Sequence, residues 1–269
     1  MPDPRLAPRA LLIDLDGVIY RGRQVLPGAH ALFAHLHQHR IPYRLLTNNA
    51  TLTPRQYQAK LRAMGIRVPA TSVLTSAVAT AAYLREVAGP GARVLVVGER
   101  GLRNALRAAG CVLVDRQADY VVAGLDRTVC YPRLTAACLA IAAGATFIGT
   151  NPDPAFPTEE GLWPGAGAIQ ALLTACTGVR PRVIGKPQPT MLEQALRQLG
   201  VAPADALMVG DSLLTDVAGG RAAGVPTALV LTGVTRASDL AAATVRPDHV
   251  FRDLAELLAA LGARHELLA

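Results

Sequence analysis

Lysine is almost absent from this chain. Of its 27 basic residues only Lys60 and Lys186 are lysines, and all the others are arginines. This skew, together with abundant alanine, glycine and proline, is what a biased codon composition would produce. Each of the two lysines therefore stands out against the background.

Aromatic residues are also scarce, at 4% of the chain, and no segment is densely basic. The formal net charge of +7 could point to an anionic partner, but the excess is spread along the chain. Nucleic acids are usually held by clustered basic side chains, with aromatic rings between them where single strands are bound. We therefore predict no nucleic-acid partner.

Long apolar runs and paired cysteines are missing as well. No run approaches the ~18 residues that a membrane-crossing helix needs, so we expect no membrane partner. The first residues lack the basic segment and apolar stretch of a secretory signal. The four cysteines show no C-x-x-C spacing, which disfavours a zinc site and a disulfide framework. These absences together predict a cytoplasmic protein.

Apolar residues, by contrast, make up 51% of the chain, against only 17% charged residues. That composition favours a well-buried core, and 269 residues suffice for one large domain or two modest ones. Short apolar runs alternate with helix-like segments, as in a doubly wound parallel sheet with helices on both faces. A Gly/Pro break at 88–92 begins a second series of alternating strands and helices. Strand and helix segments like those of the first part of the chain resume at Pro181. We predict an α/β core domain, residues 1–79 and 183–269, with a smaller α/β domain inserted at 80–182.

Polar residues collect where the predicted strands end. The apolar run "LLIDLDGVIY" carries Asp14 and Asp16, whose side chains point to the same side of an extended strand because they are two residues apart. The other candidates at or just after predicted strand ends are Thr47, Asn48, Lys186, Asp211 and Asp216. Ligand groups in open parallel sheets gather beyond the carboxyl ends of the strands, so we predict that these residues form one site.

These residue types suit phosphoryl transfer. Clustered carboxylates repel one another unless a cation lies between them, and Mg²⁺ prefers such oxygen ligands while keeping water for a substrate phosphate. Thr47 and Lys186 are groups that hold phosphoryl oxygens. An aspartate can attack phosphorus to form an aspartyl phosphate, and a second acid can protonate the leaving oxygen and then activate water. We predict that Asp14 and Asp16 divide these two tasks.

Four segments, "DLDGV", "LLTNN", "GKP" and "GDSLLTD", resemble the four motifs of haloacid dehalogenase (HAD) superfamily phosphatases and occur in that family's order. The inserted domain and the "TNPD" at Thr150–Asp153 are similar to subclass IIA, which carries an α/β cap and includes the NagD-like and 4-nitrophenyl phosphatases. The resemblance spans nearly the whole chain. It implies a HAD-like Rossmannoid core, with the inserted domain as a cap that determines substrate specificity.

The resemblance also implies roles for individual residues. Asp14 would be the nucleophile and Asp16 the general acid and base. Mg²⁺ would be held by Asp14, Asp211 and the backbone carbonyl of Asp16. Asp216 would support the metal-bound waters or Lys186.

Substrate contacts follow from the same resemblance. Thr47 and Lys186 would bind the phosphoryl group, with help from Asn48. The loop 151–165 is polar and irregular and follows a predicted strand end, so we expect its residues Asn151 and Asp153 to face substrate. The implied enzyme is a Mg²⁺-dependent phosphoric monoester hydrolase that works through a phospho-aspartyl intermediate, and the family suggests a homodimer. Its small phosphorylated substrate would be a sugar phosphate, a nucleotide, phosphoglycolate, pyridoxal phosphate or p-nitrophenyl phosphate.

Other interpretations stay open at this level. An acid in the first turn of a helix is favourable anyway, so Asp216 fits a structural role as well as a functional one. A HAD-type dehalogenase would share the nucleophile, but a leaving halide needs no proton from Asp16. A phosphoacceptor receiver module uses similar residues, but it is shorter and places its lysine last, whereas Asp211 follows Lys186 here. A catalytically silent binding protein is a further alternative.

Overall fold

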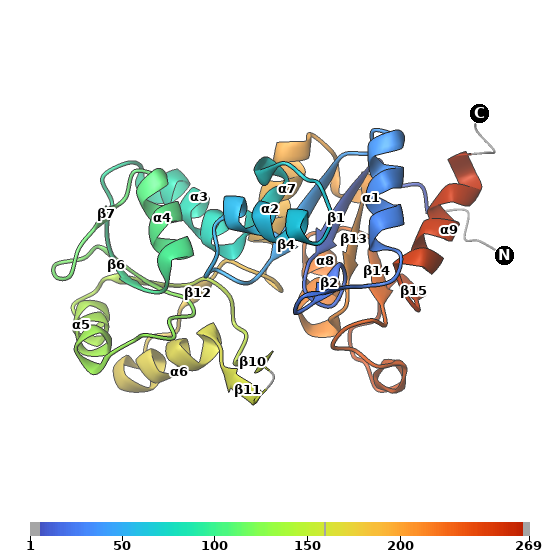
Figure 1. The fold of residues 1–269 in the computed structure, drawn as a ribbon. Coiled ribbons are helices and arrows are strands. Elements are labelled where there is room, and N and C mark those ends of the chain that lie inside the picture. The colour runs from blue at the N-terminus through green and yellow to red at the C-terminus, as the bar shows by residue number, and fades with distance from the viewer. Residues whose placement is uncertain (1–5, 159, 266–269) are drawn as a thin grey trace. The chain divides into compact units, whose positions relative to one another are not determined.

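The computed structural model describes residues 6–158 and 160–265. The chain divides into two compact units, coloured along the sequence in Figure 1. The core unit comprises Met1–Thr47, Tyr57–Leu74 and Lys186–Ala269, and the inserted unit comprises Asn48–Gln56 and Thr75–Gly185. The inserted unit contains all of the predicted insertion at 80–182 and also takes in the segment that follows Thr47. Its role as a cap stays a prediction.

A six-stranded sheet forms the centre of the core unit, in the order β15-β14-β13-β1-β4-β5. β1 pairs in parallel with β13 on one side and with β4 on the other, and β14 pairs in parallel with β13 and β15. The chain therefore builds outward from β1 in both directions, which confirms the predicted doubly wound α/β fold. The strands are β1 (Ala10–Asp14), β4 (Tyr43–Thr47), β5 (Val73–Thr75), β13 (Ala206–Gly210), β14 (Thr227–Val230) and β15 (His249–Phe251).

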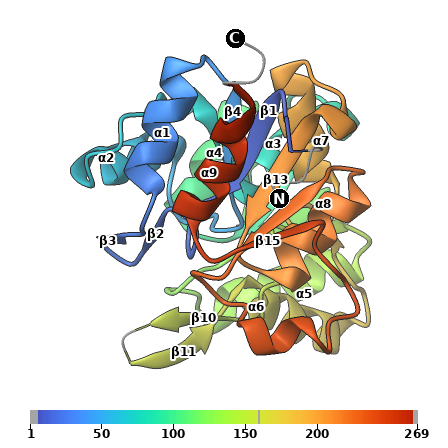
Figure 2. The same cartoon turned by 90° about the vertical axis from the view of Figure 1, so that its right-hand side faces the viewer.

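Helices cover both faces of this sheet (Figure 2). α1 packs against α9 on one face, and α7 packs on β1 and β4 from the other. All five residues of β1 are buried in consequence, which explains its continuous apolar sequence. The helices are α1 (Ala29–Gln38), α2 (Pro54–Ala63), α7 (Thr190–Leu199), α8 (Ala218–Ala222) and α9 (Leu254–His265). The shorter elements are β2 (Tyr20–Arg21), β3 (Gln24–Val25), η1 (Ala70–Ser72), η2 (Pro203–Asp205), the π-helical η3 (Leu213–Val217) and η4 (Ala237–Leu240).

The start of α2 is set by a local hydrogen-bond pattern. The Gln56 amide donates to Thr53 Oγ1 at 3.3 Å, and the Thr53 amide donates to Gln56 Oε1 at 2.8 Å. This reciprocal arrangement satisfies two amides that the first turn of a helix would otherwise leave unbonded. It fixes the beginning of a helix that carries Tyr57 and Lys60, both of which matter for the site.

The inserted unit is built on a five-stranded parallel sheet in the order β12-β9-β8-β6-β7. α5 and α6 pack together and lie on its strands, where Leu95, Val121 and Phe147 belong to the buried apolar cluster. α3 and α4 form a second helix pair. The strands are β6 (Arg93–Val97), β7 (Val112–Leu113), β8 (Tyr120–Ala123), β9 (Thr146–Gly149) and β12 (Arg182–Val183), and the helices are α3 (Ser76–Ala88), α4 (Arg100–Ala108), α5 (Tyr131–Ala142) and α6 (Ala166–Thr177).

The loop predicted to be irregular at 151–165 contains a hairpin instead. β10 (Ala155–Thr158) and β11 (Gly161–Pro164) pair antiparallel, with Phe156 opposite Trp163. Their rings meet edge to face with centroids 6.3 Å apart, a cross-strand aromatic contact that stabilises such a ribbon. The abundance of proline and glycine concealed this pairing. Within the described part of the chain, no helix has both the length and the apolar character needed to traverse a bilayer.

Candidate active site

Lys186 lies at the centre of a buried charge cluster in the core unit. Its Nζ donates to Asp14 Oδ1 at 2.5 Å and to Asp216 Oδ1 at 2.6 Å, and only 2% of the side chain is exposed. Asp14 ends β1, and Asp216 lies in η3 just after β13. Burial lowers the pKa of Lys186, but attraction to Asp14 and Asp216 outweighs it and leaves the pKa raised. Lys186 is therefore a fixed cation.

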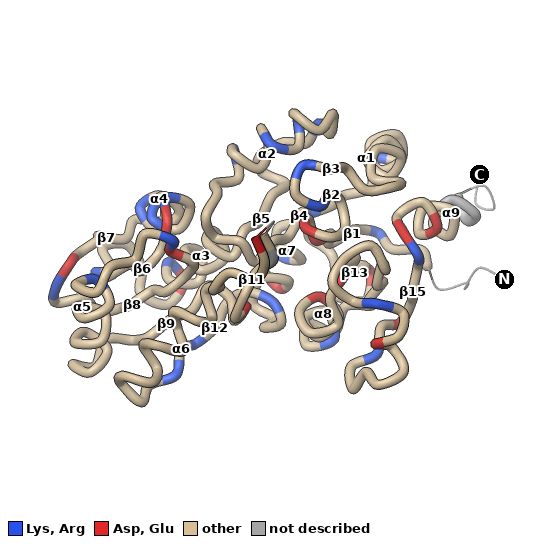
Figure 3. Tube along the Cα trace, turned by 60° about the horizontal axis from the view of Figure 1, so that its bottom comes forward, with Lys and Arg blue, Asp and Glu red and all other residues tan. Residues whose placement is uncertain are grey.

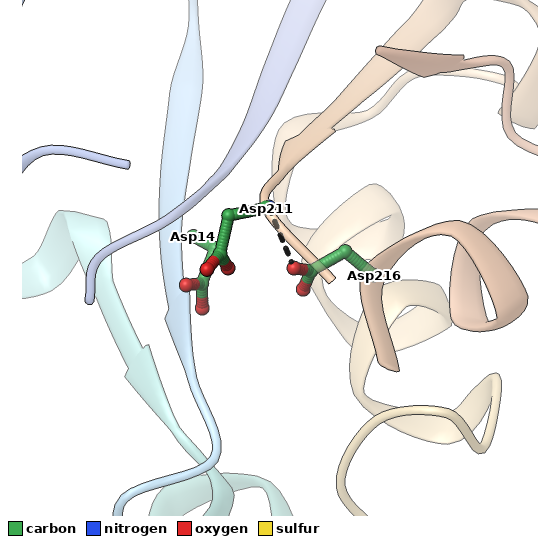
Figure 4. Close-up of side chains that lie close together, drawn as sticks. All are labelled: Asp14, Asp211 and Asp216. Carbon is green, nitrogen blue, oxygen red and sulfur yellow. Dashed lines mark hydrogen bonds between the residues drawn. The ribbon is translucent and has the colours of Figure 1, made fainter. Parts of the chain in front are cut away.

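Three carboxylates, two of which bind this lysine, lie close to one another (Figure 4). Asp14, Asp211 and Asp216 each offer an oxygen, and these oxygens lie within 4.8 Å of one another. Burial raises the pKa of Asp14 well above its ordinary value, and repulsion from Asp216 and Asp211 adds to the rise while Lys186 opposes it. One ammonium therefore does not balance three acids at this spacing, and the cluster is poised for further positive charge.

Both carboxylate oxygens of Asp216 accept hydrogen bonds from other groups of the protein. Its Oδ1 accepts from Lys186, and its Oδ2 accepts from the amides of Asp211 and Ser212 at 3.0 and 3.1 Å. A Cβ on Gly210 would collide with the Asp216 side chain, so glycine is required there for this close approach. These contacts favour a positioning role for Asp216, toward Lys186 and the loop after β13.

The cluster fits a hard divalent cation. Asp211 Oδ2 accepts from the Val234 amide at 2.6 Å, which fixes the carboxylate beside Asp14. A Cβ on either Gly17 or Gly233 would meet the Asp211 carboxylate, so two glycines keep the space around it open. Carboxylate oxygens brought together in this way are the ligands that Mg²⁺ prefers. The carboxylate oxygens of this cluster therefore fit Mg²⁺, the metal that the sequence predicts.

We expect the metal-free protein to become more stable as the pH falls from about 8 to about 5. Burial and the Asp216 charge raise the pKa of Asp211 to about 7, whereas an unfolded aspartate titrates near ~4. The folded state therefore binds a proton that the unfolded state releases, and this contribution to stability is lost as the pH rises through 7. Saturating Mg²⁺ should reverse the trend, because the ion binds the ionised carboxylates.

Thermal unfolding in EDTA and in Mg²⁺ across this pH range tests the expectation. Asp211→Asn has no proton to exchange at this position, so its melting temperature should lose the part of the pH slope that lies around pH 7 and most of the response to Mg²⁺. If the variant keeps the slope and the Mg²⁺ response of the wild type, Asp211 is neither the titrating group nor a ligand.

Asp16 lies apart from the three clustered acids. Its side chain is exposed, and its Oδ2 accepts from the Tyr20 hydroxyl at 3.3 Å. The Lys60 ammonium lies 3.7 Å from the centre of the Tyr20 ring. Desolvation by the surrounding residues of the protein raises the pKa of Asp16, while Lys60 and the Tyr20 hydroxyl oppose the rise. A raised pKa favours the protonated carboxyl group, which is the form that a general acid needs.

Lys60 and Tyr20 were not singled out as site residues by sequence reasoning. The scarcity of lysine was the signal that could have found Lys60, since one of the two lysines lies at Asp14 and the other acts on Asp16. Tyr20 ends the same apolar run that carries Asp14 and Asp16, but nothing in that pattern shows its hydroxyl turning back to Asp16.

Thr47 is placed next to the cluster by strand register. Asp14 pairs with Leu46, so Thr47 follows directly at the carboxyl end of β4. It is buried and makes a hydrogen bond with Tyr57, whose pKa burial raises. Thr47 therefore lies at the same sheet edge as Asp14, as the sequence predicts for a phosphoryl ligand.

The other three predicted substrate residues meet within the inserted unit. The amides of Asn48 and Asn151 both donate to Asp153 Oδ2, at 3.1 and 2.8 Å. Thr150 Oγ1 donates to Asn151 Oδ1 at 2.8 Å, and Gln170 donates to the Asn151 carbonyl at 2.9 Å. These bonds hold a single polar cluster in one conformation.

Comparisons with known proteins fit this geometry. A model of the family described as haloacid dehalogenase-like hydrolase matches residues 11–112, and a second HAD hydrolase-like model matches residues 183–257. The acid sugar phosphatase of Staphylococcus aureus is 44% identical over 254 residues, which are 94% of this chain and 98% of that protein. The chain belongs to the haloacid dehalogenase-like hydrolase family. It is a phosphatase of that family, which confirms the predicted fold class and enzyme class.

Solved structures of this HAD family extend the likeness to the whole fold. The 4-nitrophenylphosphatase of Thermotoga maritima has a TM-score of 0.91 at 37% identity, over 94% of this chain and 97% of that one. The glycerol phosphate phosphatase of Mycobacterium tuberculosis, in complex with magnesium, has a TM-score of 0.87 at 41% identity, over 93% of this chain and 76% of that one. The roles of individual residues in the present chain stay predictions.

Proposed function

We propose that this HAD phosphatase hydrolyses small phosphate monoesters with Mg²⁺ as its cofactor, through a phosphoryl group carried transiently by Asp14. The observation that carries the proposal is the pairing of buried Asp14 with Lys186 beside the Asp211 carboxylate. The names of the relatives support sugar and polyol phosphates as the substrate class and p-nitrophenyl phosphate as an assay substrate. A cytoplasmic location and a homodimer are part of the same proposal.

Mg²⁺ would be held by the Asp14 and Asp211 carboxylates together with the backbone carbonyl of Asp16. When bound it neutralises negative charge on the substrate phosphate and on the clustered acids. Lys186 adds a fixed positive charge beside Asp14, and the Thr47 hydroxyl can donate to a phosphoryl oxygen.

The chemical steps then fall to two aspartates. An Asp14 carboxylate oxygen attacks phosphorus and forms an acyl phosphate, while the bond from phosphorus to the ester oxygen breaks. The leaving oxygen takes a proton from Asp16. Asp16, now ionised, takes a proton from water as that water attacks phosphorus, which releases phosphate and restores both carboxyl groups.

Removal of the Asp16 proton should affect substrates unequally. We expect Asp16→Asn to release a burst of p-nitrophenol close to one per site and then turn over slowly, because this leaving group needs no proton but the second step needs a base. Glycerol phosphate, whose alkoxide must be protonated, should give no burst. Rapid-quench kinetics of both substrates measure this difference.

Tyr20→Phe is the matched control, since it removes the hydroxyl that contacts Asp16 and keeps the carboxyl group. We expect it to lower the rate for both substrates by a similar, small factor. A burst of equal size with both substrates in Asp16→Asn would show that Asp16 is not the general acid.

The family assignment and the presence of Asp16 favour this proposal over the alternatives. A dehalogenase needs no proton donor at this position, and the two relatives named above that match 94% of this chain are phosphatases rather than receiver modules. A chain that retains a stable phosphoryl group without repeated turnover would favour the receiver interpretation.

A further inference from the structure

The inserted unit contains a cavity of its own, with a volume of about 480 Å³. Its walls come from the loop after β6, the helix α4, the loop after β8 and the start of α5. Five arginines line it, against two carboxylates: Arg100, Arg103, Arg107, Arg127 and Arg133. A cavity of this size matches small-molecule sites in proteins, which span roughly 300–1,000 Å³.

The cavity lies at the switch point of the inserted sheet. β6 and β8 are neighbours, but the chain leaves β6 through α4 toward β7 and leaves β8 through α5 toward β9, on the opposite side. The loops that follow two such strands diverge and leave a crevice, which is where doubly wound sheets bind ligands. The cavity therefore occupies the position that the topology favours for a ligand.

A dinucleotide does not suit this crevice. The end of β6 and the residues after it read "VVGERG", with Val96 where the dinucleotide motif has its first glycine. Gly101 has a packing reason to be glycine, because a Cβ there would collide with the backbone of Ala50 and Thr51. Recognition must instead come from side chains.

Two of the arginines are fixed by the protein. Arg127 binds Glu99 through two hydrogen bonds of 2.7 and 2.8 Å, which neutralises both charges. Arg103 donates to the carbonyls of Gly98 and Val96 at 3.0 and 3.1 Å, so its guanidinium is oriented but its charge is not neutralised. A preoriented guanidinium is suited to bind an anion with little loss of side-chain entropy.

The remaining three arginines keep their positive charge. Arg100 and Arg107 lie on the face of α4 that also carries Arg103, and basic residues mark this helix in Figure 3. Among the residues that the structure describes, no carboxylate forms an ion pair with Arg100, Arg107 or Arg133. The second acid of the lining, Asp126, is buried and accepts from the Thr128 amide and hydroxyl at 3.0 and 2.9 Å. Like charges gathered in one concavity repel unless an anion binds among them.

We propose that this cavity binds a small phosphorylated metabolite through Arg100, Arg103, Arg107 and Arg133. Guanidinium groups form paired, charge-assisted hydrogen bonds with phosphate oxygens, which gives both affinity and orientation. The site is separate in composition from the acidic cluster of the core unit, and its binding does not depend on the phosphatase mechanism.

Calorimetry with inorganic pyrophosphate as the probe tests binding directly. The protein is kept in EDTA at low ionic strength, so that metal and phosphoryl transfer play no part. The site variant is the triple substitution Arg100→Gln, Arg107→Gln, Arg133→Gln. We expect it to weaken pyrophosphate binding by at least about tenfold, because charge-assisted bonds to phosphate are among the strongest hydrogen bonds.

A matched triple variant controls for the loss of charge. Arg85→Gln, Arg116→Gln, Arg180→Gln removes the same three charges from exposed positions of the inserted unit that do not line the cavity. It should bind pyrophosphate within about twofold of the wild type, since exposed charges away from the cavity act on the ligand only weakly through water of high dielectric constant. Equal weakening in the two triples, or no weakening in the site variant, would overturn the proposal.

A kinetic arm distinguishes two sources of the phosphate. If the site receives the second phosphate of a substrate, the site variant should raise KM for fructose 1,6-bisphosphate and leave KM for p-nitrophenyl phosphate unchanged. If the site receives a separate effector, the ratio of the two KM values should be the same in the site variant as in the wild type. Pyrophosphate should then change the rate of the wild type in saturating Mg²⁺ and leave the rate of the site variant unchanged. Either result supports the site. If pyrophosphate binds but neither kinetic effect is seen, pyrophosphate is an adventitious ion only and the proposal is overturned.

Discussion

Asp14→Asn should lower kcat for p-nitrophenyl phosphate by a factor on the order of 10⁴ to 10⁶, which is the scale seen when an enzyme loses its nucleophile. The amide has nearly the same shape as the carboxylate but cannot form an acyl phosphate at a useful rate. Lys186 would still donate to Asp216, so the variant should fold and keep a cooperative thermal transition. Steady-state kinetics and thermal unfolding on the same sample measure the two effects.

A loss of activity alone does not distinguish a nucleophile from a residue that holds Lys186. Acid quenching during turnover, followed by peptide mass analysis, should find a phosphoryl group on the peptide that contains Asp14 in the wild type and none in the variant. Asp205→Asn is the matched control, because Asp205 is an aspartate of the same unit with a weak, exposed ion pair to Arg9 at 3.7 Å. Its kcat should stay within about twofold of the wild type. Substantial turnover by Asp14→Asn, or a phosphoryl group on another residue, would refute the assignment.

The fold and the grouping of the main acids were predictable because the apolar pattern of each strand agrees with the way a parallel sheet brings strand ends together. β1 is a continuous apolar run that ends at Asp14, β13 reaches Gly210 just before Asp211, and a parallel sheet brings those ends together. The lysine could be singled out by its rarity, since chance alone would seldom place one of two lysines between Gly185 and Pro187 in a motif of this family. The alternation of elements predicts the parallel sheet, and the strand order that the structure shows then places these residues beside one another.

What could not be predicted depends on contacts between residues far apart in the chain. The grouping of Asn48–Gln56 with the inserted unit reflects contacts such as the Gly101 amide bonded to the Thr51 carbonyl at 3.0 Å, which periodicity does not encode. The hairpin of β10 and β11 was hidden because its stabilising pair, Phe156 and Trp163, is surrounded by turn-forming residues. The bond from Tyr20 to Asp16 depends on how the chain turns back after β1.

Lys186→Met should destabilise the metal-free protein by about 3–5 kcal/mol at neutral pH, the cost typical of removing one partner from a buried ion pair. Methionine fills a similar volume but leaves Asp14 and Asp216 facing each other without a cation. Burial and mutual repulsion already raise the pKa of Asp14, and loss of the ammonium would raise it further. Activity should fall by about 10³-fold or more, since the phosphoryl group loses a fixed charge.

The pH dependence of this loss separates charge from packing. An acid whose pKa is raised in the folded state stabilises that state below its unfolded pKa and loses this contribution as the pH rises through the folded value. The stability deficit of Lys186→Met should therefore shrink as the pH falls from neutral toward about 4, and Mg²⁺ should shrink it at neutral pH. A deficit that is constant with pH would mean that methionine simply packs badly.

A second substitution completes the test. Lys186→Met combined with Asp216→Asn removes one of the two unpaired acids, so it should recover much of the lost stability while activity stays low. Lys60→Met serves as the lysine control: Lys60 is half-buried over the Tyr20 ring rather than enclosed by two carboxylates, so its loss should cost less than about 1 kcal/mol. Recovery of stability in the double variant without recovery of activity would show that the lost stability comes from the unpaired acids, and that the lost activity of Lys186→Met is not a consequence of its instability.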